Sequence, residues 1–365
     1  MSAYLTIKNL SVSLPNGVRI LRNVSLDVAA GQVHGLVGES GAGKSMIGKA
    51  VLGTLPHKIE ITGGEIWIDG VDLLKLTPKE RRKKIGALAA LIPQDPLTAL
   101  NPSKRIGPQI TSRLVDILGW SQQNAIARAV ELLEQVHIPD PARVMRSYPH
   151  ELSGGMRQRI LIASAFAAEP KLIIADEPTT ALDVTVQKQI LKLIAQMQAR
   201  HGTALLFVTH DLGVVSKVCD TLSVLYAGKV IENANMRRFF TRPIHPYSRA
   251  LLAATPTYTN PDSLLTSVSD EIVQGLADEI HYQEQHMIYR VKDLRLSFAD
   301  MARKPLVGRA PRIEVLKGIS FDIPKGAVLG IVGGSGSGKS TLGRAMLRLI
   351  EPDTGQIEFD GIDIS

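Results

Sequence analysis

The sequence predicts an α/β protein with a buried, largely parallel sheet that is present once in full and a second time in part. Three observations support this prediction. Short, continuous apolar segments, which suit strands buried on both faces, occur at 32–37, 171–178 and 204–211. A glycine-rich turn connects the first of them to a helix-like segment that starts near Ser45. Much of the N-terminal sequence is then repeated after residue 287.

Composition sets the broad class. A chain of 365 residues has room for about two domains, and an apolar share of 44% with a charged share of 21% is typical of soluble globular proteins. The net charge of +7 suits nucleic acid, an anionic membrane surface or a phosphate ligand, without choosing among them. No apolar run reaches the roughly 18 residues of a membrane helix, and the opening lacks a signal-peptide core. Cys219 is the only cysteine, which excludes an internal disulfide and favours a reducing, cytoplasmic setting.

The repeat organises the chain. The two copies stay in register except for an 11-residue basic insertion around 300–312 in the second copy, which we expect to be a surface loop. The matching pairs of segments are 4–14 with 289–298, 21–45 with 316–340, and 64–73 with 355–364.

Two charged stretches have competing interpretations. The segment between the copies, 257–286, is acidic and has no Lys or Arg, which predicts a solvated linker; a short acidic helix packed on one domain is the alternative. The basic run 81–84 predicts a solvated helix face, with lipid or partner contact as the alternative.

The glycine-rich turn matches a phosphate-binding loop. Gly38, Gly43, Lys44 and Ser45 have the required spacing, with a strand before them and a helix after, so that backbone N–H groups converge on phosphate at the helix start. Lys44 is expected to reach the β- and γ-phosphates of ATP, and Ser45 to hold Mg²⁺. A glycine-rich turn without a ligand is the alternative. The expected contacts are Gly38, Glu39, Ser40, Gly41, Ala42, Gly43, Lys44, Ser45 and Met46, with Gly333, Gly338, Lys339, Ser340 (also a metal ligand) and Thr341 in the second copy.

Polar side chains follow the next two apolar segments. Asp176 and Glu177 end the segment 171–178, where Asp176 suits the Mg²⁺ shell and Glu177 is placed to polarise an attacking water. His210 emerges at the end of 204–211, where a contact to the γ-phosphate would be needed.

A second helix start also suits phosphate. In LSGGMRQR (152–159), Ser153 is expected to cap a helix, and Gly154 and Gly155 leave N–H groups bare. One γ-phosphate does not need two such helix ends from one chain. We therefore expect this end to face the nucleotide of a partner domain.

Taken in order, these motifs resemble the nucleotide-binding domain of ATP-binding cassette (ABC) transporters. The resemblance implies a P-loop NTPase core with an antiparallel β subdomain and a helical subdomain at about 95–160. It assigns 1–255 to a complete domain, with an importer-type C-terminal segment at about 232–256, and 287–365 to the N-terminal fragment of a second domain. The motifs are GESGAGKS (38–45), PQDP (93–96), LSGGMRQR, LIIADEP (172–178), ALD (181–183) and VTHD (208–211).

The same resemblance gives roles to further residues. Gln94 would link Mg²⁺ and water to a transmembrane partner, and is a metal and catalytic candidate. Ser153, Gly154 and Gly155 would be the signature that closes on the opposite ATP, and Asp183 would lie in the loop between the two sites. The family usually stacks an aromatic ring on adenine: the second copy has Phe298 there, but the first has Leu14, which is expected to weaken ATP binding.

Four further segments are similar to ATPases of oligopeptide, dipeptide and nickel importers, and the duplication is similar to the type that includes the glutathione importer ATPase. The resemblance implies peptide-like solutes, two transmembrane permease subunits, a solute-binding protein, a second ATPase domain (homodimer or paralogue), no nucleic acid, and a peripheral place on the cytoplasmic face of the inner membrane. The segments are 93–102, 147–159, 176–187 and 242–256.

The second copy ends early in this alignment, because Ser365 corresponds to about Leu74 of the first. The sequence therefore predicts a truncated second ATPase domain with uncovered strand edges and poor behaviour. Two alternatives to an importer ATPase remain open at this point. One is a remnant that binds nucleotide without hydrolysing it, and the other is a soluble ABC protein that acts on ribosomes or DNA.

Overall fold

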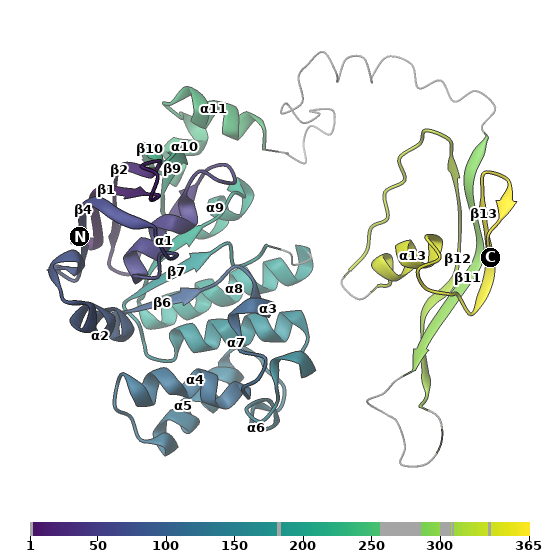
Figure 1. Ribbon diagram of the computed structural model, residues 1–365, viewed down its shortest axis with the longest axis horizontal. Coiled ribbons are helices and arrows are strands. Elements are labelled where there is room, and N and C mark those ends of the chain that lie inside the picture. Colours follow the sequence, from purple (N-terminus) through teal and green to yellow (C-terminus); the bar gives the residue numbers. More distant parts are fainter. Residues whose placement is uncertain (1–2, 181–183, 256–285, 300–307, 309, 335–336) are drawn as a thin grey trace. The chain divides into compact units, whose positions relative to one another are not determined.

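The computed structural model describes residues 3–180, 184–255, 286–299, 308, 310–334 and 337–365 (Figure 1). The chain divides into two compact units, one made almost entirely of residues up to 267 and the other of residues from 268 onward. Residues 257–285 of the expected linker and most of the expected loop 300–312 lie outside the described residues.

A six-stranded sheet forms the centre of the first unit. Its order is β10-β9-β3-β8-β7-β6, and only β10 runs antiparallel to its neighbour. The three apolar segments of the sequence are confirmed as the buried strands β3, β7 and β8. The strands are β3 (Val33–Val37), β6 (Ala89–Ile92), β7 (Leu172–Asp176), β8 (Ala204–Val208), β9 (Thr221–Tyr226) and β10 (Lys229–Asn235).

A second, antiparallel sheet packs over helix α1 (Lys44–Leu52). Ile47 and Val51 of α1 share one buried cluster with Leu5 of the antiparallel sheet and with Ile174 of β7, so the helix is enclosed between the two sheets. This arrangement fixes the position of the helix start. The sheet has the order β2-β1-β4-β5 and consists of β1 (Ala3–Ser13), β2 (Arg19–Ala29), β4 (Glu60–Ile68) and β5 (Val71–Asp72).

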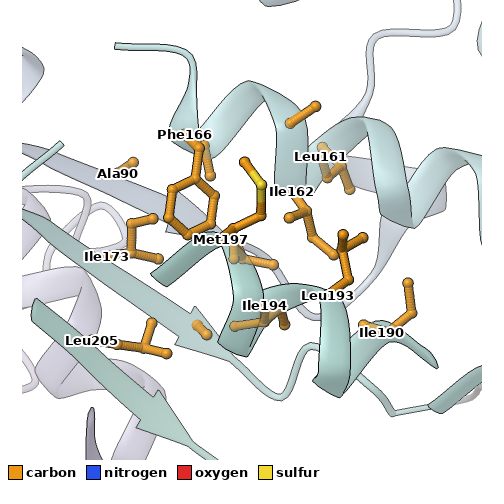
Figure 2. Packing of buried hydrophobic residues seen from close by; sticks show 14 of the residues in the cluster. Ala90, Leu161, Ile162, Phe166, Ile173, Ile190, Leu193, Ile194, Met197 and Leu205 are labelled. Atoms are coloured by element: carbon orange, nitrogen blue, oxygen red, sulfur yellow. The ribbon is translucent and has the colours of Figure 1, made fainter. Parts of the chain in front are cut away.

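Helices cover the other face of the six-stranded sheet. Alternate residues of a strand point to opposite faces. Ile173 of β7 therefore belongs to the buried cluster under these helices, whereas Ile174 belongs to the cluster around α1. Figure 2 shows side chains of α7 (Gly154–Phe166) and α8 (Val184–His201) meeting over the strand residues Ile173 and Leu205. The helical side chains labelled there are Leu161, Ile162, Phe166, Ile190, Leu193, Ile194 and Met197.

The expected helical segment 95–160 contains short helices and the start of α7. The basic run 81–84 lies on helix α2, where Arg82 and Lys83 are exposed, as expected for a solvated face. No helix among the described residues combines the length and apolar character that crossing a bilayer would require. The remaining helices are η1 (Leu73–Lys75), α2 (Pro78–Leu88), α3 (Pro96–Ala99), α4 (Ile106–Asp116), α5 (Gln122–Gln135), α6 (Pro141–Val144), η2 (Pro149–Glu151), α9 (Leu212–Val218), α10 (Met236–Thr241) and α11 (Pro246–Ala253).

The second unit repeats the antiparallel sheet and the glycine-loop helix. The segment 328–332, which aligns with β3, forms no strand here, and Val328 and Val332 are 99% and 92% exposed. Strand β3 is buried because β8 and β9 flank it, and the described part of the second unit contains no counterpart of either. Its elements are β11 (Met287–Ala299), β12 (Arg312–Pro324), α13 (Lys339–Met346), β13 (Thr354–Phe359) and β14 (Ile362–Asp363).

His34 is a titratable side chain that is buried in the central sheet of the first unit. His34 of β3 is 5% exposed and lies beside β9. Ser223 donates its hydroxyl hydrogen to Asn233 Oδ1 at 2.5 Å, so its oxygen is left to accept from His34 Nε2 at 2.7 Å. The Thr221 hydroxyl then donates to His34 Nδ1 at 2.8 Å. With Thr221 as the donor, these contacts fit a neutral imidazole that carries its proton on Nε2.

We therefore predict that His34 stays neutral in mildly acidic solution. Burial lowers the pKa of His34 from 6.5 to about 4, so between these values the unfolded chain binds a proton that the folded chain does not. The free energy of unfolding should consequently fall as pH falls through this window, by on the order of 3 kcal/mol over the full range. Imidazole ¹⁵N chemical shifts should report a neutral His34 at pH 5.5. Titration of His34 with a midpoint near 6.5 would contradict the burial argument.

Candidate functional site

The turn after β3 has a backbone that only glycine can supply at two points. Gly38 has φ +152°, and a Cβ there would collide with the carbonyl oxygen of Leu225 at the end of β9. Gly43 has φ +102°, and a Cβ there would lie 2.8 Å from Leu21 Cδ2 of β2. The turn is thus pressed between the two sheets, directly before the first residue of α1. This confirms the strand–turn–helix context that a phosphate loop requires.

Lys44 is folded back into this loop. It is 5% exposed, and its Nζ donates to the carbonyl oxygens of Gly38 and Glu39, each at 2.8 Å. Burial lowers the pKa of Lys44, while the carboxylates of Glu177 and Asp176 oppose that shift. The loop therefore encloses a cation whose hydrogen bonds go to its own backbone. Phosphate oxygens are stronger acceptors for an ammonium group than neutral carbonyls are.

Ser45 and Asp176 meet at the first turn of α1. The Ser45 hydroxyl donates to Asp176 Oδ1 at 2.8 Å. Burial raises the pKa of Asp176, and the hydrogen bond from Ser45 opposes the shift. A hydroxyl oxygen and a carboxylate at the end of a strand are hard oxygen ligands, which is the donor type that Mg²⁺ takes. Two of the residues predicted for the metal, from separate motifs, are thus brought together and fit that ion.

Glu177 is held in an uncommon backbone conformation by its neighbours. Its φ is +44°, in the left-handed region, and its N–H donates to Val208 O of β8 at 2.9 Å. Its carboxylate has three polar neighbours: Oε1 lies 3.2 Å from His210 Nδ1, and Oε2 accepts from Gln94 Nε2 at 3.1 Å and from Thr180 Oγ1 at 3.0 Å. The side chain of Glu177 is 14% exposed, whereas that of His210 is 56% exposed. The carboxylate is thus oriented on one side and open on the other.

A cavity of about 580 Å³ joins these parts. Its polar wall combines the phosphate loop with Gln94, Glu177 and His210, as the sequence predicted. Ile20 and Leu251 line it as well, and neither residue was predicted, since no motif marks them. The full lining is Ile20, Gly38, Glu39, Ser40, Gly41, Gly43, Lys44, Ser45, Met46, Gln94, Glu177, His210 and Leu251.

Leu14 does not line this cavity. It borders a separate hollow of about 1100 Å³ over the antiparallel sheet, together with Arg19 and His57. The β2 side chain that reaches the phosphate-loop cavity is Ile20. The larger hollow has none of the strand-end carboxylates that surround the phosphate loop, so its size does not make it the better candidate for nucleotide chemistry.

The LSGG segment begins α7, away from the lining of this cavity. Ser153 caps the helix as predicted, since its Oγ accepts from Met156 N at 3.3 Å. Gly154 is exposed, and a Cβ there would meet no atom within 4 Å. The predicted contact of Ser153, Gly154 and Gly155 with a partner's nucleotide stays a prediction. Asp183 lies outside the described residues.

Gln158, four residues further along α7, was missed by the sequence analysis. It is 1% exposed, and its Nε2 donates to Pro178 O at 2.7 Å. Pro178 directly follows Glu177. One buried amide therefore connects the LSGG helix with the backbone beside the candidate catalytic carboxylate. The only signal in the sequence was a glutamine within an otherwise apolar helical face.

The second copy forms its own loop in a similar way. Lys339 Nζ donates to Gly333 O at 2.8 Å and to Gly334 O at 2.6 Å, and Gly338 has φ +92°. Ser340 and Thr341 lie in the first turn of α13, as Ser45 and Met46 do in α1. Phe298, at the end of β11, is 42% exposed. The described ends of this loop thus resemble those of the first copy, but within the described second unit no carboxylate contact to Ser340 accompanies them.

Comparison with known proteins agrees with this geometry. The sequence profile of the family described as ABC transporter matches residues 21–180 and 316–365. The glutathione import ATP-binding protein GsiA of Salmonella typhimurium is 38% identical over 359 residues, covering 94% of this chain and 57% of the relative. GsiA of Escherichia coli O6:H1 is 36% identical over 379 residues, covering 98% and 60%. The chain therefore spans somewhat over half the length of these relatives.

Solved structures show the same likeness. CbiO1 of Clostridium perfringens, part of the ABC transporter complex CbiONQ, superposes with a TM-score of 0.58 at 26% identity, covering 66% of this chain and 92% of that one. The ATP-binding cassette MJ0796, in a dimeric post-hydrolysis state bound to ADP and Pi, gives a TM-score of 0.57 at 26% identity, covering 64% and 99%.

The loop geometry predicts that Lys44→Ala weakens binding of inorganic tripolyphosphate by about 10- to 100-fold, because a charge-assisted hydrogen bond is lost inside a buried loop. Lys49→Ala is the matched control, since it removes a lysine from the same helix without touching the loop and should change affinity by less than about threefold. Isothermal titration measures both. Equal losses in the two variants would mean that net charge, rather than the loop, binds the anion.

Proposed function

Because this chain belongs to the ABC transporter family, we propose that its first unit binds ATP in the phosphate loop and hydrolyses it to ADP and phosphate. One observation carries the proposal: Glu177, His210 and Gln94 converge beside Lys44 in one cavity, although they come from three different strand ends. No single segment of the chain requires this convergence. It is the arrangement that in-line attack of water on a phosphoryl group needs.

Each of these residues has its own role in the proposed hydrolysis of ATP. Lys44 exchanges its backbone carbonyl partners for phosphate oxygens and balances their charge. Glu177 accepts a proton from the attacking water, and its contacts with Gln94, Thr180 and His210 fix the direction of its carboxylate. Ser45 and Asp176 would hold Mg²⁺, which when bound supplies positive charge that stabilises the phosphates.

A second ATPase domain completes the proposed site. The helix start at Ser153 has exposed N–H groups and does not line the cavity of its own chain. Such a helix end favours an anion. We propose that Ser153, Gly154 and Gly155 close on the nucleotide of a second copy or a paralogue, as the dimeric form of the MJ0796 cassette suggests by analogy.

We propose import of peptide-like solutes as the biological task. Support comes from the relatives named as glutathione import ATP-binding proteins and from the importer-type segments of the sequence. Two permease subunits and a solute-binding protein would be the partners, with this chain on the cytoplasmic face of the inner membrane. Co-purification with a membrane permease supports this task, and co-sedimentation with ribosomes instead would contradict it.

Glu177→Gln should bind ATP with nearly unchanged affinity and lower the hydrolysis rate by at least about 100-fold, because the amide keeps the shape of the carboxylate and cannot accept the proton. Steady-state phosphate release and ATP titration measure the two effects. Glu169→Gln is the matched control, since that carboxylate contacts Arg128 outside the cavity. Unchanged hydrolysis in Glu177→Gln would refute the assignment of the catalytic base, and a parent rate equal to that of Lys44→Ala would refute hydrolysis altogether.

The bond from Gln158 to Pro178 generates a separate prediction. Gln158→Met preserves volume and removes a hydrogen bond next to Glu177, so the hydrolysis rate should fall about 3- to 10-fold while the affinity for ATP changes less than twofold. Gln189→Met is the control, because Gln189 also bonds the LSGG helix, through Arg159, but not the backbone near Glu177. A loss of affinity without a loss of rate in Gln158→Met would assign this residue to nucleotide binding instead.

A further inference from the structure

The C-terminal segment of the first unit, which contains α11, is attached to the central sheet by hydrogen bonds. The proposed hydrolysis of ATP assigns no role to this segment. Glu232 of β10 is 6% exposed, and its carboxylate accepts the N–H groups of Ile244 at 2.9 Å and His245 at 3.0 Å. His245 then caps α11, since its Nδ1 accepts from Tyr247 N at 3.1 Å. A buried carboxylate on the central sheet thus sets where α11 begins.

From this start, α11 contacts the phosphate loop. The half-buried Tyr247 hydroxyl accepts the backbone N–H of Glu39 at 3.3 Å. The Tyr247 ring packs on that of Tyr226, with centroids 4.4 Å apart. Tyr226 follows Leu225, whose carbonyl oxygen closes the space behind Gly38. The two entry residues of the loop, Gly38 and Glu39, are therefore held from the side of β9 and α11.

The same contact reaches Lys44 through a single residue, Glu39. Glu39 offers its N–H to Tyr247 and its carbonyl oxygen to Lys44 Nζ. One turn further along α11, Leu251 lines the cavity itself. Helix α11 thus contacts the backbone of the phosphate loop and also lines the cavity that a ligand would fill.

We propose that α11 is a working part of the phosphate-binding site, in which Tyr247 positions the loop entry and thereby couples the docking of α11 to occupancy of the loop. This inference rests on the proposed nucleotide function. A helix start such as that of α1 directs its N–H groups toward an anion, and the N–H of the loop residue Glu39 is bonded to Tyr247. Tyr247 therefore pre-organises the loop through Glu39, and its loss weakens binding.

The coupling is reciprocal. If α11 favours the occupied loop, then an occupied loop favours docked α11 by the same factor. Any contact that draws α11 away from the loop would lower the affinity for nucleotide. A partner that binds the segment 242–255 could thereby change the affinity of the phosphate loop for nucleotide.

The test uses the full chain, inorganic tripolyphosphate as the probe, and a matched pair of variants. Tyr247→Phe keeps the ring contact with Tyr226 and removes the acceptor, whereas Tyr226→Phe keeps the same ring pair and leaves the bond to Glu39 intact. We expect the dissociation constant to rise about 3- to 10-fold in Tyr247→Phe and less than twofold in Tyr226→Phe. Thermal unfolding without ligand should give the same midpoint for both, which separates positioning from general stability.

Hydrogen exchange supplies the reciprocal measurement. Saturating tripolyphosphate should slow amide exchange of residues 247–253 in the parent chain, and slow it less in Tyr247→Phe. Equal affinities in the two tyrosine variants, tighter binding by Tyr247→Phe, or exchange of α11 that ignores the ligand would each overturn this inference and leave the proposed function standing. A parent chain that does not bind tripolyphosphate would overturn both.

Discussion

The parallel pairing of β3 with β8 and of β8 with β7 is the constraint on which the site depends. Because the C-terminal ends of parallel strands meet at one edge, the turn after β3, the carboxylates after β7 and the histidine after β8 are delivered to the same place. The loop itself is then shaped by two glycines wedged against β9 and β2, at Gly38 and Gly43. Burial on both faces holds these strands inside the sheet, so the polar side chains that follow them are held at its edge.

The second unit contains a similar sequence whose segment aligned with β3 has no parallel strand beside it in the described residues. In the described part of its glycine loop, Lys339 is bonded to the backbone as Lys44 is. The aligned strand does not form, and Val332 is 92% exposed. Loop geometry is therefore encoded locally, in glycine spacing and one lysine. A central strand depends on its neighbours, because five apolar residues in a row have no preferred face and gain stability only when covered on both sides.

The contrast between local loop geometry and neighbour-dependent strands explains which features could be predicted from the sequence. Ser45, Asp176, Glu177 and His210 were predictable because each follows a recognisable strand or glycine signal, and the structure brings all four together. The sequence analysis also expected uncovered strand edges in the second copy, where 328–332 forms no strand. Leu14, which aligns with the aromatic position, lies in the turn between β1 and β2, whereas Ile20 of β2 lines the cavity.

Contacts between distant segments were beyond the sequence. Gln158 with Pro178, and Tyr247 with Glu39, join residues 20 and 208 positions apart, and neither pair has a spacing rule that would reveal it. The segment around Tyr247 was noticed as a family feature without a physical role. Both contacts end on backbone atoms, so the identity of the partner residue leaves no trace in the pattern.

A crystal structure with Mg²⁺ and a non-hydrolysable ATP mimic tests the central claim most directly. The account predicts triphosphate at the start of α1, Lys44 Nζ moved from the carbonyl oxygens of Gly38 and Glu39 to phosphate, and a cation beside Ser45 and Asp176. A vacant loop with Lys44 still bonded to those carbonyls, or the mimic seated in the hollow beside Leu14 and His57, would contradict it.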